Sequence, residues 1–159
     1  MRIGYGFDSH EFRAGIPLKI GGIVLAHDRG LGGHSDGDVL LHALTDALLG
    51  AIAGPDIGML FPPSEAKWKG ADSVIFLSEA LKRLRDAGYG VANVDACLIL
   101  AAPKIGPHAA AIRMRVAELL GVHADCVGLK AKTPEGLNQE HAAVAHVVVL
   151  VEKVRRRKK

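Results

Sequence analysis

The chain has 159 residues, of which 49% are hydrophobic and 4% aromatic, and its net charge of +3 becomes −2 without the final five residues, Arg155–Lys159. This length fits one domain with its own hydrophobic core, and the aliphatic composition favours an α/β fold. A basic nucleic-acid-binding surface is excluded, and no apolar run approaches the ~20 residues of a membrane span.

We predict one domain over residues 1–153 and a basic, disordered tail over residues 154–159. No targeting segment precedes the first predicted strand, so we expect a cytoplasmic protein with neither membrane nor nucleic-acid partners. Cys97 and Cys126 lack the spacing of a metal or redox motif, which favours two buried free thiols over a disulfide.

The first predicted strand runs from Arg2 to His10, where the side chains alternate between two faces. One face carries Ile3, Tyr5 and Phe7. The opposite face carries Gly4, Gly6, Asp8 and His10. The two glycines leave space beside the polar pair, as a ligand pocket requires.

Residues 18–20 and 23–25 are predicted to form a hairpin that turns at Gly21-Gly22. The glycine-rich segment 30–33 is predicted to be flexible. A helix follows over about residues 38–53, with Ser35 or Asp36 as its N-cap and Gly54-Pro55 as its stop.

One narrow stripe of that helix is polar, and it consists of Asp38, His42, Thr45 and Asp46. The remaining helix residues are almost all aliphatic, so the helix should be buried. A solvated stripe would normally carry Lys, Glu or Arg. We therefore predict that this stripe faces a site rather than water.

The rest of the chain alternates helices and strands after a loop over residues 56–69, which has Phe61-Pro-Pro63 at its centre. We predict a helix over 71–87, a strand over 89–102, a helix between Pro107 and Gly121, and strands over 126–132 and 142–152. The last strand is apolar on both faces. Three helices cover one face of a mixed four- to five-stranded sheet, so the other face should pack against further copies of the chain.

Asp8, His10 and His42 form the strongest candidate site. An Asp and a His two residues apart share one strand face, and a helix His can close over them. Two imidazoles and one carboxylate would hold a zinc ion with its fourth position open. Lone histidines are often core or surface residues, but the combined pattern favours a metal. Asp46 is equally consistent with holding His42 in place and with being a surface carboxylate.

Two further segments suit phosphate chemistry. His34 and Ser35 precede a helix N-terminus, where free N–H groups favour anions, although Ser35 as a cap alone explains its presence. The segment 132–136 offers a Lys, a Thr and a Glu within one turn, which suits a metal-bound diphosphate but is also an ordinary turn sequence. The backbone of segment 101–107 could contact a flat nucleobase, or the segment could simply connect a strand to a helix.

Together these blocks resemble one family. They comprise Gly4-x-Gly-Phe-Asp-x-His10, Gly21-Gly22, His34-Ser-Asp-Gly-Asp38, His42–Ala51, Asp56-Ile-Gly58, Leu60-Phe-Pro62, Lys69–Ser73, Asn93-Val-Asp95, Ala102-Pro-Lys104 and Lys132-Thr133. Their order and spacing are similar to those of the 2-C-methyl-D-erythritol 2,4-cyclodiphosphate synthase family of the non-mevalonate isoprenoid pathway, from Met1 to about Leu137.

The resemblance implies a homotrimer whose sheets surround a three-fold axis, with active sites between subunits. It implies a lyase that converts 4-diphosphocytidyl-2-C-methyl-D-erythritol 2-phosphate to the 2,4-cyclodiphosphate with release of CMP. It also implies Zn²⁺ at Asp8, His10 and His42, and Mg²⁺ or Mn²⁺ at Glu135. His34 and Thr133 match transition-state stabilisers.

The resemblance further assigns the substrate contacts. Those for erythritol and phosphate are Ser9, Ser35, Asp56, Ile57, Gly58, Phe61, Pro62, Pro63, Ser64 and Glu65. Those for the cytidine nucleotide are Leu100, Ala101, Ala102, Pro103, Lys104, Ile105, Gly106, Lys132 and Pro134, with residues 100–106 supplied by a neighbouring subunit. Asp38 and Asp46 are expected to support the zinc ligands.

The segment Asn138–Ala143 departs from the family pattern, because it is shorter and lacks the Phe and Arg of the axial pocket that binds isoprenoid diphosphates in some members. Two other interpretations stay open on the residues alone. Two His and one carboxylate also hold iron in oxygenases, although those scaffolds are mostly all-β. A non-catalytic trimeric binding module is the second.

Overall fold

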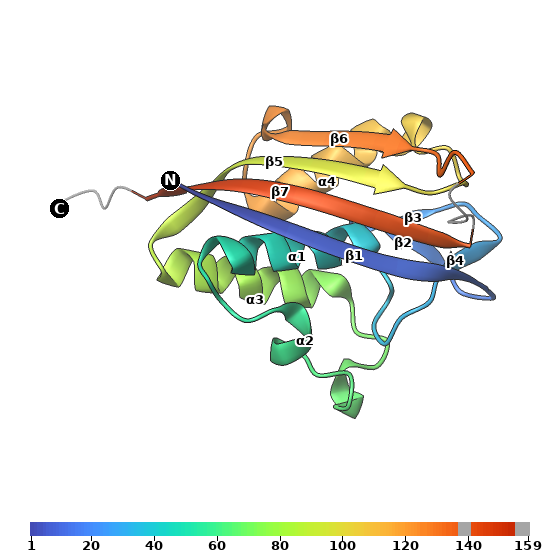
Figure 1. The fold of residues 1–159 in the computed structure, drawn as a ribbon, viewed down its shortest axis with the longest axis horizontal. Helices are drawn as coiled ribbons and strands as arrows, with labels where there is room; N and C mark the ends of the chain where they lie inside the picture. Colours follow the sequence, from blue (N-terminus) through green and yellow to red (C-terminus); the bar gives the residue numbers. More distant parts are fainter. Residues whose placement is uncertain (137–140, 155–159) are drawn as a thin grey trace.

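A computed structural model describes residues 1–136 and 141–154, and in it one mixed sheet carries a layer of helices on one face (Figure 1). The sheet order is β4-β1-β7-β5-β6. Its strands are β1 (Arg2–Ala14), β4 (Arg29–Leu31), β5 (Tyr89–Ile99), β6 (Val127–Lys132) and β7 (Ala142–Lys153). Only β5 and β6 pair in parallel, and the other neighbours are antiparallel. The prediction of a mixed sheet with helices on one face is confirmed (Figure 1).

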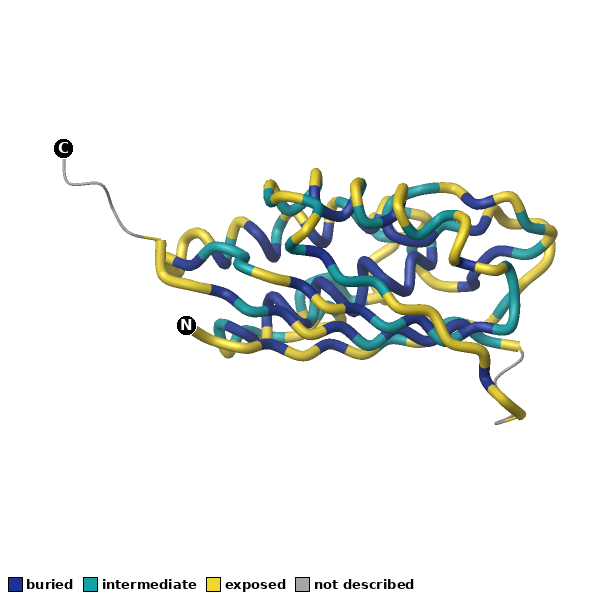
Figure 2. Tube along the Cα trace, turned by 90° about the horizontal axis from the view of Figure 1, so that it is seen from above, coloured by how far each residue is buried: buried dark blue, intermediate teal, exposed yellow. Residues whose placement is uncertain are grey.

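The helical layer consists of α1 (Val39–Ala51), α3 (Ser73–Asp86) and α4 (Ala109–Leu120), and β2 (Leu18–Ile20) and β3 (Ile23–Leu25) form the predicted hairpin. Figure 2 shows the strands and helices as two layers, with buried and exposed residues alternating along the chain. Helix α1 is buried along almost its whole length, between the sheet and α3. The aliphatic residues of this helix therefore form the centre of the core.

Gly4 and Gly6 do not open a pocket, so that prediction is wrong. A Cβ at Gly4 would lie 1.8 Å from the Ala47 carbonyl oxygen, and one at Gly6 would lie 1.9 Å from the Ala43 carbonyl oxygen. The two glycines instead let the backbone of β1 lie directly against α1. This close approach brings Asp8 and His10 within reach of the helix that carries His42.

Asp38, rather than Ser35 or Asp36, is the N-cap of α1. Its carboxylate accepts hydrogen bonds from the backbone N–H groups of Leu41 at 3.0 Å, Gly21 at 2.9 Å and Gly22 at 2.7 Å. One fully buried side chain thus starts the helix and fixes the turn of the β2–β3 hairpin to it. The helix ends at Ala51, about two residues earlier than predicted.

Several other boundaries differ from the predictions. The segment predicted as flexible contains β4, and β1 continues to Ala14 in order to pair with it. The predicted loop 56–69 contains the short helices α2 (Ile57–Leu60) and η1 (Ala66–Trp68). A 3-10 turn, η2 (Gly106–His108), precedes α4, and η3 (Ala124–Cys126) precedes β6.

The outer face of the sheet is apolar over β1 and β7. Ile3, Tyr5 and Phe7 are 70%, 57% and 49% exposed, and Val148 is 43% exposed beside them. These residues lie opposite the helical layer, as predicted. No helix in the described part of the chain is long and apolar enough to span a membrane.

Three further predictions concern the cysteines and the C-terminal region. Within the described residues Cys97 and Cys126 are free thiols, but both are half-buried rather than buried. The predicted tail, apart from Val154, and residues 138–140 of the divergent segment lie outside the described residues.

Candidate metal centre and neighbouring pockets

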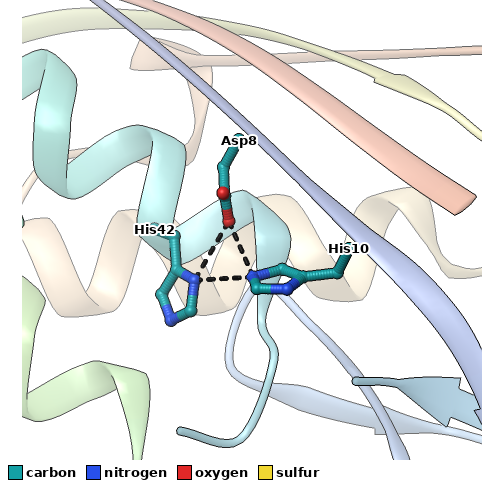
Figure 3. Close-up of side chains that lie close together, drawn as sticks. All are labelled: Asp8, His10 and His42. Atoms are coloured by element: carbon teal, nitrogen blue, oxygen red, sulfur yellow. Dashed lines mark hydrogen bonds and ion pairs between the residues drawn. The ribbon is translucent and has the colours of Figure 1, made fainter. Parts of the chain in front are cut away.

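Asp8, His10 and His42 meet at one point between β1 and the first turn of α1 (Figure 3). Asp8 Oδ2 lies 2.8 Å from His10 Nε2 and 3.0 Å from His42 Nδ1. The two ring nitrogens are 2.9 Å apart. Residues far apart in the sequence therefore present three ligand atoms to one another, as predicted.

Hydrogen bonds alone do not account for the close approach of Asp8 Oδ2, His10 Nε2 and His42 Nδ1. If both imidazoles donated to Asp8, their two N–H groups would face each other across 2.9 Å. A cation among the three atoms removes that conflict, because carboxylates and neutral imidazoles are both good ligands for one. The donor set is the two-nitrogen, one-oxygen set of open catalytic zinc sites.

The electrostatics of the cluster keep Asp8 ionised. Burial alone would raise the pKa of Asp8, but the close contacts and electrostatic attraction of His10 and His42 outweigh burial and lower the pKa to about 2. Burial disfavours the charged form of His10, yet the Asp8 carboxylate raises its pKa above the ordinary value. The carboxylate is thus ready to bind a cation across the physiological range.

The four residues of the predicted polar stripe do not all face this centre. Only His42 does so, whereas Asp38 and Thr45 are fully buried and bonded to backbone, the latter donating to the Leu41 carbonyl at 2.7 Å. Asp46 Oδ1 accepts the Ile57 N–H at 2.8 Å, which ties the start of α2 to α1. Burial raises the pKa of Asp46.

A cavity of about 140 Å³ opens beside the triad. Its walls are His10, His34, Ser35, His42, Ile57, Gly58, Phe61, Pro63, Trp68 and Phe76. It thus gathers much of the predicted erythritol and phosphate set. Trp68 and Phe76 were missed by the sequence analysis, because they follow Phe61 by 7 and 15 positions and no local pattern joins the three rings. Their ring centroids lie 5.1 Å and 4.5 Å from that of Phe61.

The remaining predicted erythritol and phosphate contacts lie outside that wall. Ser9 alternates with Asp8 and His10 and so belongs to the other face of β1. Asp56 is the N-cap of α2 and accepts the Met59 N–H at 2.7 Å. Pro62, Ser64 and Glu65 do not line the cavity.

A second, larger cavity of about 580 Å³ lies at the ends of β5 and β6. Its walls are Leu100, Ala101, Pro103, Lys104, Ile105, Gly106, Ala109, Leu129, Ala131, Lys132, Thr133 and Glu135. Most of the predicted nucleotide set is therefore together, whereas Ala102 and the buried Pro134 are not part of the wall.

Glu135 has an unusual backbone in this second cavity. Its φ of 49° is left-handed, a conformation that costs a non-glycine residue on the order of 1 kcal/mol. Its exposed carboxylate accepts a hydrogen bond from the Thr133 hydroxyl. A carboxylate kept at a position that glycine would occupy more cheaply points to a role for its charge.

The two cavities are separate within one chain. Asp8 and His10 lie on β1, Glu135 follows β6, and β7 and β5 stand between these strands. Three strand spacings amount to roughly 14 Å. The two predicted metal positions of a single chain are therefore held apart by the width of the sheet.

Comparison with known proteins gives one consistent result. The YgbB family profile matches residues 1–152. The chain is 65% identical to a 2-C-methyl-D-erythritol 2,4-cyclodiphosphate synthase of Koribacter versatilis, over 96% of this chain and 99% of that protein. It is 52% identical to the chloroplastic enzyme of Arabidopsis thaliana, over 96% of this chain and 67% of that protein. A solved synthase structure described as a CDP-bound form superposes with a TM-score of 0.90 at 41% identity, covering 95% of this chain and all of that one.

Proposed function

Since this chain belongs to the YgbB family, we propose that its two cavities together carry out the reaction named in its relatives, the formation of 2-C-methyl-D-erythritol 2,4-cyclodiphosphate. The chain acts on 4-diphosphocytidyl-2-C-methyl-D-erythritol 2-phosphate. The convergence of Asp8, His10 and His42 beside a cavity lined by histidine, serine and aromatic side chains is the observation that carries the proposal.

The reaction needs no nucleophile from the protein. An oxygen of the 2-phosphate bonds to the β-phosphorus, the bond from that phosphorus to the α–β bridging oxygen breaks, and CMP leaves with the oxygen. We therefore class the enzyme as a phosphorus–oxygen lyase. Both partners are anionic, because a phosphomonoester carries about −1.5 to −2 charges near neutral pH. The task of the site is to align them and to neutralise charge.

The residues present fit two divalent cations. Asp8, His10 and His42 would hold Zn²⁺, and Glu135 would hold Mg²⁺ or Mn²⁺. When bound, these ions supply positive charge to the diphosphate oxygens. His34, Ser35 and the Ile57–Gly58 backbone then position the erythritol end, while Thr133 donates to a phosphate oxygen.

The nucleotide end belongs in the larger cavity. The loop 100–106 closes over the base, and Lys104 and Lys132 offer cations to the α-phosphate. A solved relative described as bound to CDP supports a cytidine nucleotide as the ligand. The walls of this cavity combine apolar side chains with Lys104 and Lys132, as a base joined to a phosphate requires.

A homotrimer would join the two cavities. Within one chain they are separated by the sheet, and the apolar outer face of β1 and β7 is uncovered. Three sheets packed around an axis would cover that face and bring the larger cavity of one subunit to the metal centre of the next. The cytoplasmic location and the disordered tail stay predictions; plant relatives are described as chloroplastic.

Phosphorus NMR of the cytidylylated substrate, with and without a chelator, tests the function. We expect CMP and a cyclic diphosphate in the metal-replete sample and neither after chelation. The His42→Ala variant should lose turnover with the oligomer intact. If metal-replete protein forms no cyclic product, the proposal is wrong. Iron with oxygen consumption would favour an oxygenase, and an unaffected His42→Ala variant would favour a binding module.

A further inference from the structure

His42 has a second nitrogen, Nε2, that points away from Asp8 and His10 (Figure 3). Ser73 Oγ lies 2.9 Å from it and Ser35 Oγ lies 3.0 Å from it. Ser73 is the first residue of α3 and is fully buried. Ser73 is not among the predicted site residues, so its buried hydroxyl has no assigned role in the site described above.

Ser73 is hydrogen-bonded in turn to Asp36, which forms a half-buried ion pair with Lys19. The Ser73 hydroxyl donates to Asp36 Oδ1, and its backbone N–H donates to Asp36 Oδ2 at 3.2 Å. Lys19 Nζ donates to the same Oδ2 at 3.0 Å and reaches Asp72 at 3.5 Å. The chain of contacts therefore runs from Lys19 on the hairpin through Asp36 and Ser73 to His42.

The direction of the hydrogen bonds along this chain is fixed by the charges. Burial raises the pKa of Asp36, but the bonds from Ser73 and Lys19 outweigh burial and lower it, so Asp36 is a carboxylate that can only accept. A hydroxyl has one proton, and that of Ser73 goes to Asp36. Ser73 Oγ can therefore only accept from His42 Nε2–H.

We propose that Asp36 and Ser73 are positioning residues that hold His42 in the tautomer whose Nδ1 lone pair faces Asp8 and His10. With the proton on Nε2, the Nδ1 atom is free to bind a cation. The polarised Ser73 hydroxyl also makes that nitrogen a stronger donor of electrons to the metal. This inference rests on the proposed zinc site, and it assigns a function to residues outside the predicted substrate and metal sets.

The direct test is the zinc affinity of metal-free protein, measured by competition with a chromophoric chelator. Ser73→Ala removes the hydroxyl whose own proton is committed to Asp36, and it leaves Ser35 Oγ beside Nε2. Partners of this kind are worth 10–100-fold in metal affinity, so we expect a loss in that range. Ser78→Ala is the matched control, because Ser78 lies on the same helix and its exposed hydroxyl bonds only the Val74 carbonyl. That control should bind zinc as the unmodified protein does.

Asp36→Asn provides a second variant. Its amide can donate to Ser73, which frees the Ser73 proton to turn toward Nε2 and favours the wrong tautomer of His42. We expect a similar loss of zinc affinity. The double variant should lose little more than either single one, because both changes break the same chain. Independent effects on folding would instead add.

Nitrogen-15 NMR of the imidazoles in the metal-free protein reads the tautomer without any metal or substrate. We expect a protonated Nε2 at His42 in the unmodified protein and a mixed population in Ser73→Ala. Unchanged zinc affinity and an unchanged His42 tautomer in folded Ser73→Ala would overturn the inference. Tight zinc binding without a cyclic product would instead refute the proposed function and leave the positioning role standing.

Discussion

The Gly6→Ala substitution probes the contact on which the metal centre depends. The added Cβ would lie 1.9 Å from the Ala43 carbonyl oxygen, and Cβ contacts under 3.0 Å essentially do not occur. Strand and helix must therefore separate by about 1.1 Å, and both partners are backbone, so no side chain can rotate out of the way. Overpacking of this kind costs up to ~3 kcal/mol, or roughly 6–12 °C in melting temperature for a chain of this size.

The same separation moves Asp8 and His10 away from His42, because Gly6 and Ala43 each lie next to a ligand-bearing stretch of chain. A misplacement of about 1 Å can reduce a rate by ~10²-fold. We expect weaker zinc binding by chelator competition and slower release of CMP. Circular dichroism melts at one protein concentration would measure the stability loss.

Gly50→Ala is the control on the same helix. Its Cβ would lie 3.7 Å from the nearest atom, the Tyr5 carbonyl oxygen, which is an ordinary contact. Replacing a helical glycine by alanine should stabilise by ~0.5–1 kcal/mol. If Gly6→Ala melts as high as Gly50→Ala and binds zinc equally well, the close approach of β1 and α1 has been misjudged.

Three further predictions address the charges and the outer face. In metal-free protein, burial raises the pKa of Asp8, but its contacts with His10 and His42 outweigh burial and lower the pKa from 3.8 to about 2. The ionised Asp8 therefore stabilises the fold by roughly 2 kcal/mol above pH ~5. This contribution is lost as the pH falls toward 2, and Asp8→Asn should flatten that part of the unfolding curve. Ile3→Glu should dissociate the proposed homotrimer in sedimentation experiments. Val24→Glu, at a side chain that is 64% exposed on the separate hairpin, should not. Glu135→Gly relieves a left-handed backbone, so it should melt no lower than the unmodified protein while its kcat falls; a lower melting temperature with unchanged kcat would contradict this.

The sequence predicts the helices and strands well, because hydrophobic periodicity and the positions of glycines are local signals. They can be interpreted without knowledge of the tertiary contacts. The alternation from Arg2 to His10 correctly separates Ile3, Tyr5 and Phe7 from the polar pair. The same pattern misleads at Gly4 and Gly6, since a missing side chain fits a pocket and a close backbone contact equally well. Only the position of α1 decides between them.

The Asp8–His10 pair is predictable from its spacing on a strand and His42 from the polar stripe of its helix, but the groups that contact His42 from α3 are not predictable in this way. Ser73 follows Asp72 at a helix start and therefore resembles an ordinary capping segment. Its contact with His42 joins residues 31 positions apart and has no local signature. The N-cap of α1 was predicted wrongly for a different reason. Ser35, Asp36 and Asp38 are all residue types that cap helices, and the contact of Asp38 with the backbone of Gly21 and Gly22 is not visible in the sequence.

The Asp38 carboxylate also bears on the order in which the chain folds. Its three hydrogen bonds join segments within 17 residues of one another, whereas β1 must find β7 across more than 130 residues. Closing short loops loses less chain entropy than closing long ones. We expect the hairpin and helix to assemble early around Asp38 and the C-terminal strand to join late. A nascent chain would then hold the His42 end of the metal centre in place before its sheet is complete.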